Sequence, residues 1–169
     1  CEHLDREKYR VVLIHGSGGY LDHVAYSMAN TEVISLENLV REIAPKKDAT
    51  CLRQLTSLLR KYKRRGPVIL HTHSSKAGIL GRIAGQLAGI KPVIHSIHGF
   101  SFHEGQKFIL NKTYVAAEIA TGRMTDGFIG VSRANLDEAS AKGIIRPHHR
   151  IALIRSGFDI DRFFEESRD

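Results

Sequence analysis

Short apolar runs alternate with longer stretches of helical character along the whole chain. The runs are rich in Val, Ile, Leu and Phe and are continuously apolar, which is typical of strands buried in a parallel sheet. We expect strands at 11–15, 33–36, 68–70, 93–97, 128–131 and 151–154. Helices are expected between them, at 22–29, 46–65, 77–87, 107–125 and 133–142. This alternation predicts an α/β, Rossmann-like fold in which helices cover both faces of a parallel sheet.

The most informative stretch is 68–103, where two predicted strands each end in a histidine-rich loop. Ser74 or Ser75 is expected to cap the helix between them. That helix carries glycines whose spacing lets it lie close to the sheet: Gly78, Gly81, Gly85 and Gly89. Because the carboxyl ends of parallel strands meet at one edge of a sheet, we expect residues 73–76 and 98–103 to lie side by side in a ligand crevice.

The composition is that of an ordinary globular domain, with 42% hydrophobic and 25% charged residues in a chain of 169. No apolar run is long enough to span a bilayer, and the first ten residues lack the apolar centre of a signal peptide. We therefore expect a cytoplasmic protein. Cys1 and Cys51 lack the spacing of metal ligands, and we expect two free thiols.

The formal charge of +7 is concentrated in residues 46–65, which hold eight Lys and Arg against the single acid Asp48. Apolar residues in this segment repeat at helical spacing, so it predicts an amphipathic helix with a basic carboxyl end. Two interpretations stay open: a solvated helix whose cations complement its dipole, or a contact with anionic lipid or a phosphate-bearing substrate. Nucleic acid is not expected, because the patch lacks interleaved aromatic residues. The candidate membrane-contact residues are Arg60, Lys61, Lys63, Arg64 and Arg65.

Three kinds of chemical site are suggested by short motifs but are incomplete in this sequence. The segment 15–19 (HGSGG) resembles an oxyanion loop and 130–134 (GVSRA) a degenerate nucleophile elbow, but no histidine follows the acids at 159 and 161 to complete a triad. Residues 16–19 also do not match the dinucleotide pattern G-x-G-x-x-G. The histidines at 71, 73, 95, 98 and 103 have no acidic third ligand nearby except Glu104, so no metal is expected. His71 and His95 are predicted to be buried or to lie behind the site.

Four segments then occur in a characteristic order and spacing. They are 71–78 (HTHSSKAG), 95–100 (HSIHGF), Glu118 followed by Asp126 and 128–132 (FIGVS), and 154–163 (IRSGFDIDRF). Together they resemble the N-terminal domain of the family-four retaining glycosyltransferases, which have the GT-B fold. Segment 36–48 (LENLVREIAPKKD) further resembles members that act on lipid-linked or surface-polysaccharide acceptors.

The resemblance implies one half of a GT-B fold, the half on the acceptor side. Residues 1–155 would form this domain without the family's first strand, because residues 1–8 look like the end of the helix that follows that strand. Residues 156–169 would begin the interdomain linker, and the donor-binding domain would be absent. Ser156 replaces the asparagine usual before Gly157. On this basis the isolated chain is expected to be inactive.

The resemblance also implies roles for individual residues. His98 would contact the donor sugar and stabilise developing positive charge, through a hydrogen bond or its backbone carbonyl. Substrate contacts would come from His73, Ser74, Ser75, Lys76, Gly99, Phe100, Ser132 and Arg133, the last two at a helix N-terminus where amides converge. The expected partners are a nucleotide-sugar donor, a glycan or lipid-linked acceptor, and an anionic membrane at the inner face. Neither a metal nor a cofactor is implied, since helix dipoles and cations would neutralise the leaving diphosphate.

Two other functions stay open: a non-catalytic ligand-binding module of Rossmann-like fold, and a GT-B-fold nucleotide-sugar epimerase. The presence of a second domain with a donor-site glutamate pair would distinguish a transferase from the non-catalytic module. Product analysis with and without an acceptor would distinguish a transferase from the epimerase.

Overall fold

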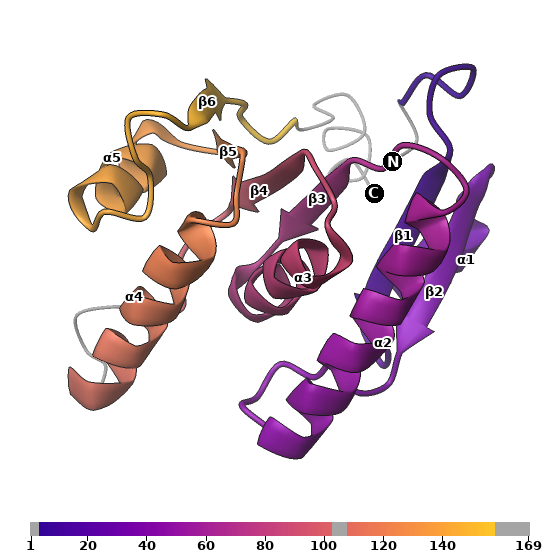
Figure 1. Ribbon diagram of the computed structural model, residues 1–169, viewed down its shortest axis with the longest axis horizontal. Helices are drawn as coiled ribbons and strands as arrows, with labels where there is room; N and C mark the ends of the chain where they lie inside the picture. Colours follow the sequence, from indigo (N-terminus) through magenta and orange to yellow (C-terminus); the bar gives the residue numbers. More distant parts are fainter. Residues whose placement is uncertain (1–3, 103–107, 158–169) are drawn as a thin grey trace, which may run out of the picture.

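The computed structural model describes residues 4–102 and 108–157 (Figure 1). Its elements, in chain order, are β1 (Val11–Gly16), α1 (Asp22–Ser27), β2 (Thr31–Leu36), α2 (Pro45–Lys63), β3 (Leu70–His73), α3 (Ser75–Ala88), β4 (Val93–Ile97), α4 (Phe108–Gly122), β5 (Gly127–Gly130), α5 (Arg133–Ala141) and β6 (Arg150–Leu153). Strands and helices alternate throughout, so the predicted α/β fold is confirmed, with boundaries that differ from the expected ones by a few residues. The predicted domain limits at 155 and 156 stay predictions.

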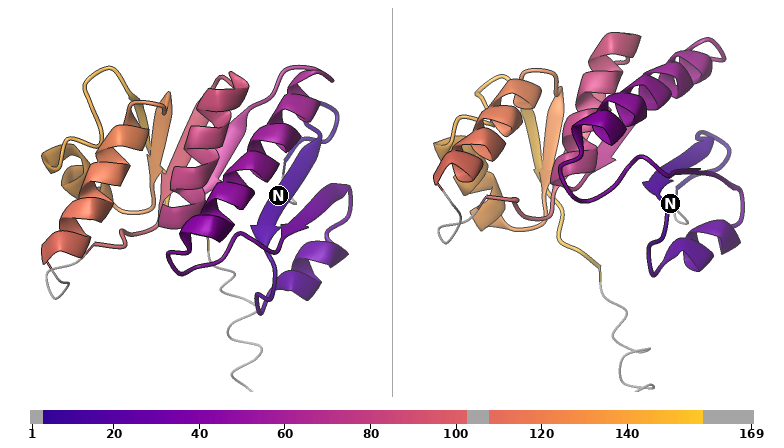
Figure 2. Two further views of the ribbon diagram at one scale, coloured as in Figure 1. Left: turned by 60° about the horizontal axis from the view of Figure 1, so that its bottom comes forward. Right: turned by 90° about the horizontal axis from the view of Figure 1, so that it is seen from below.

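All strand pairs are parallel, but the described strands form two sheets rather than one. β1 pairs with β2, and the second sheet has the order β3-β4-β5-β6. Helices α2, α3 and α4 lie next to one another in one layer, as both Figure 1 and Figure 2 show. The expectation of a single sheet was therefore wrong in this respect, and β3 is an edge strand of its sheet.

Two apolar clusters hold the layers together. The first joins α2 to α3 through buried residues that include Cys51, Leu55, Leu59 and Ala84. The second lies around β4, β5 and α5 and contains Ile97, Phe128, Leu136 and Ile144. Cys51 is a buried free thiol, as predicted, and Cys1 lies outside the described residues.

The glycines of α3 allow the helix to touch the sheet, as the sequence predicted. A Cβ atom at Gly81 would lie 2.8 Å from the Thr72 side chain, and one at Gly85 would lie 2.6 Å from that of Leu70. At Gly78 the Cβ would meet the His95 ring at 2.6 Å. Larger residues would push α3 away from the two strands that carry the histidine-rich loops.

Two local expectations were wrong, those for the start of the third strand and for the cap of α3. The third strand begins at Leu70 rather than 68, and Ile69, which precedes it, is 52% exposed. The strand is also an edge strand of its sheet and not one buried on both faces. Residues 4–8 form turns in which the amides of Lys8 and Tyr9 donate to the Asp5 carbonyl, and the interpretation of residues 1–8 as a helix end stays a prediction because residues 1–3 lie outside the described ranges. Ser74 precedes α3, but its hydroxyl makes no cap hydrogen bond.

Candidate functional site

The two histidine-rich loops meet at the carboxyl ends of β3 and β4. His73 ends β3, His98 follows β4, and the Nδ1 atom of His73 lies 3.0 Å from Nε2 of His98. One of these nitrogens donates to the other, so the contact engages Nε2 of His98 and not its Nδ1 atom. The predicted proximity of the two loops is confirmed at this pair, while His103 lies outside the described residues.

His71 extends this group along β3. Its ring centroid lies 4.3 Å from that of His73, and its Nε2 is hydrogen-bonded to the Ser96 hydroxyl at 2.8 Å. His71 is exposed, so the first of the two predicted alternatives, a buried ring, was wrong, because alternate residues of an edge strand face solvent. The second alternative, a position behind the site, stays a prediction. Desolvation of the ring and the charges of His71 and His98 lower the pKa of His73 to about 4, so His73 is neutral at pH 7.

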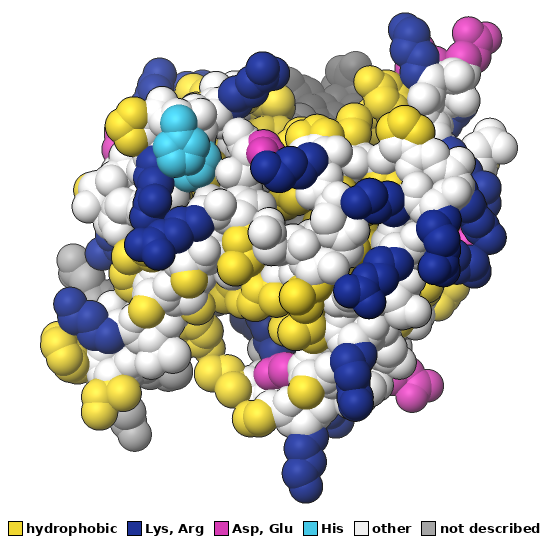
Figure 3. All heavy atoms as spheres, viewed as in Figure 1, with side chains coloured by type: hydrophobic (Ala, Val, Ile, Leu, Met, Phe, Trp, Pro, Cys, Tyr) yellow, Lys and Arg dark blue, Asp and Glu magenta, His cyan; other side chains and the backbone are white. Residues whose placement is uncertain are grey.

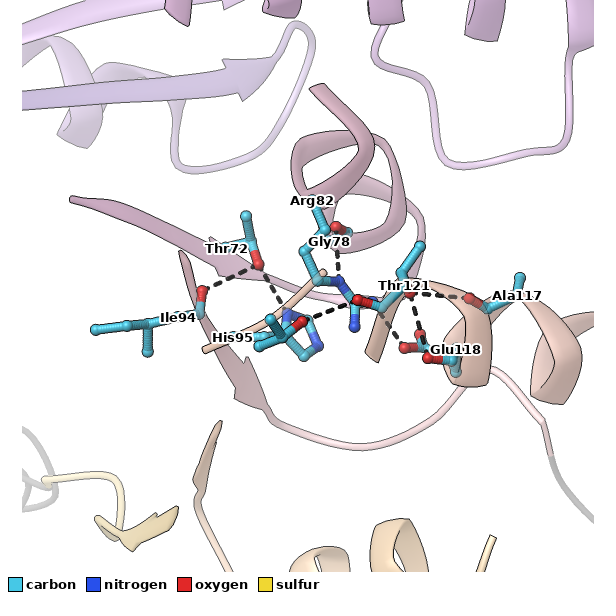
Figure 4. A network of polar contacts seen from close by, with 9 residues as sticks. Thr72, Gly78, Arg82, Ile94, His95, Ala117, Glu118 and Thr121 are labelled. Atoms are coloured by element: carbon cyan, nitrogen blue, oxygen red, sulfur yellow. Dashed lines mark hydrogen bonds and ion pairs between the residues drawn. The ribbon is translucent and has the colours of Figure 1, made fainter. Parts of the chain in front are cut away.

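Behind these loops lies a buried polar network (Figure 4). His95, on β4, is 4% exposed, as predicted, and its Nδ1 lies 2.9 Å from the Thr72 hydroxyl. Because that hydroxyl donates to the Ile94 carbonyl, it accepts from His95, whose proton is therefore on Nδ1. Burial and the positive charge of Arg82 lower the pKa of His95 to about 2, so the ring is a neutral structural group.

Arg82 and Glu118 form the centre of the network. They are 0% and 2% exposed, and Nη2 of Arg82 donates to Oε2 of Glu118 at 2.7 Å. Nε of Arg82 donates to the Gly78 carbonyl, whereas Nη1 has no hydrogen-bond partner among the described residues. The pair ties α3 to α4 directly behind the strands that carry His73 and His98. Glu118 was noted in the sequence only as part of a family motif, and Arg82 was missed, although an arginine within a small-residue helix was a usable signal.

The segment after His73 is strained and tightly held. Ser74 has φ 58° and ψ 164°, a conformation that residues other than glycine rarely adopt. Lys76, in the first turn of α3, forms a 2.6 Å ion pair with Asp48 in the first turn of α2 and also donates to the Glu42 carbonyl. Lys76 therefore joins two helices, and its predicted contact with an acceptor stays a prediction, as do those of Ser74 and Ser75.

The remaining predicted site residues surround the end of β4. Gly99 has φ 155°, and a Cβ atom there would meet no atom of the described residues within 4 Å. The Phe100 ring stacks on that of the buried Phe102, with 4.5 Å between the ring centroids. The Ser132 hydroxyl accepts from the Asn135 amide, which confirms the predicted cap of α5, and Arg133 is exposed. The Asn135 side chain donates to the Ile97 carbonyl, so the start of α5 lies beside the residue that precedes His98.

Lys and Arg side chains gather along α2, as Figure 3 shows. Two of the five candidate membrane residues also cap the end of α3: Arg60 donates to the Leu87 carbonyl, and Lys63 donates to the carbonyls of Ala88 and Gly89. Arg65 lies over the Tyr62 ring, 5.7 Å from its centroid.

The described residues offer neither a metal-binding cluster nor a membrane-spanning helix. No group of three or more His, Cys, Asp or Glu is placed to hold a metal ion within the described ranges. No helix in the same part of the chain combines the length and apolar character needed to cross a bilayer.

A parallel α/β domain whose polar loops converge at the carboxyl edge of its strands belongs to the Rossmann-like ligand-binding class. The chain matches Glycosyltransferase Family 4 over residues 1–162. It is 33% identical over 162 residues to the UDP-Gal:alpha-D-GlcNAc-diphosphoundecaprenol alpha-1,3-galactosyltransferase of Escherichia coli. That match covers 96% of this chain and 40% of the relative, so the chain spans about two fifths of the length of that enzyme. The chain belongs to glycosyltransferase family 4.

Proposed function

We propose that the full-length protein transfers a sugar from a nucleotide-sugar donor to a glycan or lipid-linked acceptor. The observation that carries this proposal is the family match, which spans both histidine-rich loops. The donor and acceptor in the name of the E. coli relative favour a lipid-linked acceptor. The described domain supplies the acceptor side of a cleft that a second, donor-binding domain closes, as in a GT-B fold.

His98 is the proposed catalytic residue. Its Nε2 is engaged by His73, so Nδ1 or the backbone carbonyl would meet the donor sugar where positive charge develops. Gly99 leaves space beside it for the sugar to approach. Ser74, Ser75, Lys76, Phe100, Ser132 and Arg133 are the proposed substrate contacts around the same edge. The transfer is proposed to retain the anomeric configuration and to need no metal or cofactor.

The test is product analysis with the full-length protein, a radiolabelled UDP-sugar and a polyprenyl-diphosphate-linked acceptor. We expect a product only when the acceptor is present, and NMR of its anomeric proton reports retention. His98→Ala should lower kcat more than it raises the acceptor KM, because the histidine acts mainly in the transition state. Conversion of the nucleotide sugar without acceptor would instead indicate an epimerase. Binding without turnover would indicate a non-catalytic module.

The domain described here should show no transfer by itself, because catalysis needs two domains to close over both substrates. Turnover by residues 1–169 alone would contradict the two-domain proposal.

We further propose a peripheral contact between α2 and the anionic inner face of the membrane, which places the protein in the cytoplasm. Each cation near the surface contributes about 1 kcal/mol of attraction, screened over roughly 8–10 Å by physiological salt. Changing the five candidate residues together to Gln should abolish sedimentation with anionic vesicles and leave the circular dichroism spectrum intact. Equal sedimentation of variant and wild type would instead favour the solvated helix. The five are Arg60, Lys61, Lys63, Arg64 and Arg65.

A further inference from the structure

A groove lies between α2 and α3, away from the histidine loops. It has a volume of about 560 Å³ and is lined by Leu52, Arg53, Thr56, Ser57, Arg60, Arg64 and Leu87. We call these residues the arginine groove. The volume is within the range of about 300–1,000 Å³ that is usual for sites of small organic ligands.

The chemistry of the lining is cationic. Arg53, Arg60 and Arg64 are spaced by seven and four residues, which places them on one side of α2, and none of the lining residues is acidic. Arg60 uses one N–H group on the Leu87 carbonyl and keeps the others. The Arg64 side chain makes no hydrogen bond or ion pair within the described residues. Guanidinium groups with free donors match the geometry of a phosphate.

Apolar surface borders these cations. Leu87, on α3, is 52% exposed, and Leu52 contributes to the opposite wall from α2. A ligand that carries a phosphate beside aliphatic chains would satisfy both features, whereas a soluble phosphate would leave the leucines in water.

The end of the groove that holds Arg60, Arg64 and Leu87 is far from the reaction site. Lys76 pairs with Asp48 at the start of both helices, and Arg60 reaches Leu87 at their ends, so α2 and α3 run in the same direction. Leu87 lies twelve residues beyond Ser75, or roughly 18 Å along the helix from the loop that carries His73. An acceptor diphosphate that reacts near His98 therefore does not reach this end of the groove.

We propose that the arginine groove binds the phosphate headgroup of an anionic membrane phospholipid that is not a substrate, with its chains beside Leu52 and Leu87. This inference rests on the membrane contact proposed above and gives that contact a specific lipid site. A bound headgroup fixes how the domain is turned on the membrane, which a diffuse attraction between charges does not.

The test compares charge-matched variants of the full-length protein in sedimentation with vesicles of phosphatidylcholine and phosphatidylglycerol. One triple variant changes Arg53, Arg60 and Arg64 to Gln, and its control changes Lys46, Lys47 and Lys61, which are exposed on the same helix but outside the groove. Both remove the same charge. We expect the groove variant to lose roughly tenfold more vesicle affinity than the control, a difference of about 1.4 kcal/mol.

A second pair of variants leaves the cations of α2 untouched. Leu87→Glu places a carboxylate inside the groove, whereas Gln86→Glu places one on the neighbouring exposed residue of α3. We expect strong loss of vesicle binding only for Leu87→Glu, with the circular dichroism spectra of both variants unchanged. If the triple variant of Arg53, Arg60 and Arg64 does not fold, this second pair still tests the proposed lipid site.

Equal losses of vesicle affinity within each matched pair would overturn the proposed lipid site in the arginine groove. They would leave the diffuse membrane contact in place. Absence of wild-type binding to the anionic vesicles would overturn both, while glycosyl transfer is tested separately by product analysis. Inorganic phosphate or glycerol phosphate should not displace the protein from vesicles at matched ionic strength. Displacement by either would assign the groove to a soluble phosphate and overturn the lipid proposal.

Discussion

Replacing Arg82 with Met would leave Glu118 as a carboxylate in the core without its partner. Both residues are almost fully buried, and the 2.7 Å contact between them is the single ion pair of this depth among the described residues. Removal of one member of a buried pair costs about 3–5 kcal/mol, because the other charge stays desolvated. We expect Arg82→Met to lower the free energy of unfolding by this amount, and Glu118→Leu to have an effect of similar size.

The double variant Arg82→Met with Glu118→Leu should be much less destabilised than either single variant. Apolar residues of similar volume often replace a buried pair at little cost. Nη1 of Arg82 already lacks a hydrogen-bond partner in the described structure, so its removal relieves a desolvation cost. The bond from Nε to the Gly78 carbonyl is lost, at about 1 kcal/mol. We therefore expect the double variant to lie within about 2 kcal/mol of wild type.

The assay is urea unfolding of the full-length protein, followed by far-ultraviolet circular dichroism, for wild type, both single variants and the double variant. Lys8→Met, which breaks the exposed ion pair with Asp5, is the control and should have no measurable effect. Additive losses in the double variant, or single losses as small as that of the control, would refute the reasoning that burial makes the pair costly to break.

Three further predictions concern the residues around this pair. Because the folded protein holds His95 neutral while the unfolded chain protonates near pH 6.5, stability should fall by about 2 kcal/mol from pH 7 to pH 5 on account of this residue. His95→Gln should flatten that part of the profile, and an unchanged slope would contradict it. Ser74→Gly should relieve the strained backbone and raise stability by about 1 kcal/mol, which a lower melting temperature would disprove. Gly78→Ala should lower the free energy of unfolding by about 1–3 kcal/mol because the added methyl group crowds the His95 ring. Gly85→Ala should be nearly neutral because the end of the Leu70 side chain can move. Equal melting temperatures of the two variants would count against this difference.

The sequence was most informative where local patterns decide the structure. The apolar run 93–97 became β4 with the predicted limits, and Ser132 caps α5 through its hydroxyl. The glycine spacing of α3 predicted the close contact with the sheet. The proximity of His73 and His98 followed from the rule that parallel strands place their carboxyl ends at one edge.

Long-range packing decided the features that were missed. The exposure of His71 depends on β3 being an edge strand, which strand order determines and local pattern does not. The pairing of Arg82 with Glu118 joins residues 36 positions apart. In the sequence, Lys76 was interpreted as a ligand contact. Its ion pair with Asp48 forms only because α2 and α3 pack side by side, which the local sequence does not reveal.

The close approach of α3 to the sheet also has an evolutionary consequence. Gly81 has no room for a Cβ atom while Thr72 stands opposite, because the short Thr72 side chain cannot move aside as the end of Leu70 can opposite Gly85. A larger residue at position 81 is therefore acceptable only together with a smaller residue at position 72 on β3. An alignment of this family should show these two positions changing together, so that 72 and 81 appear as covarying columns, whereas 70 and 85 vary independently.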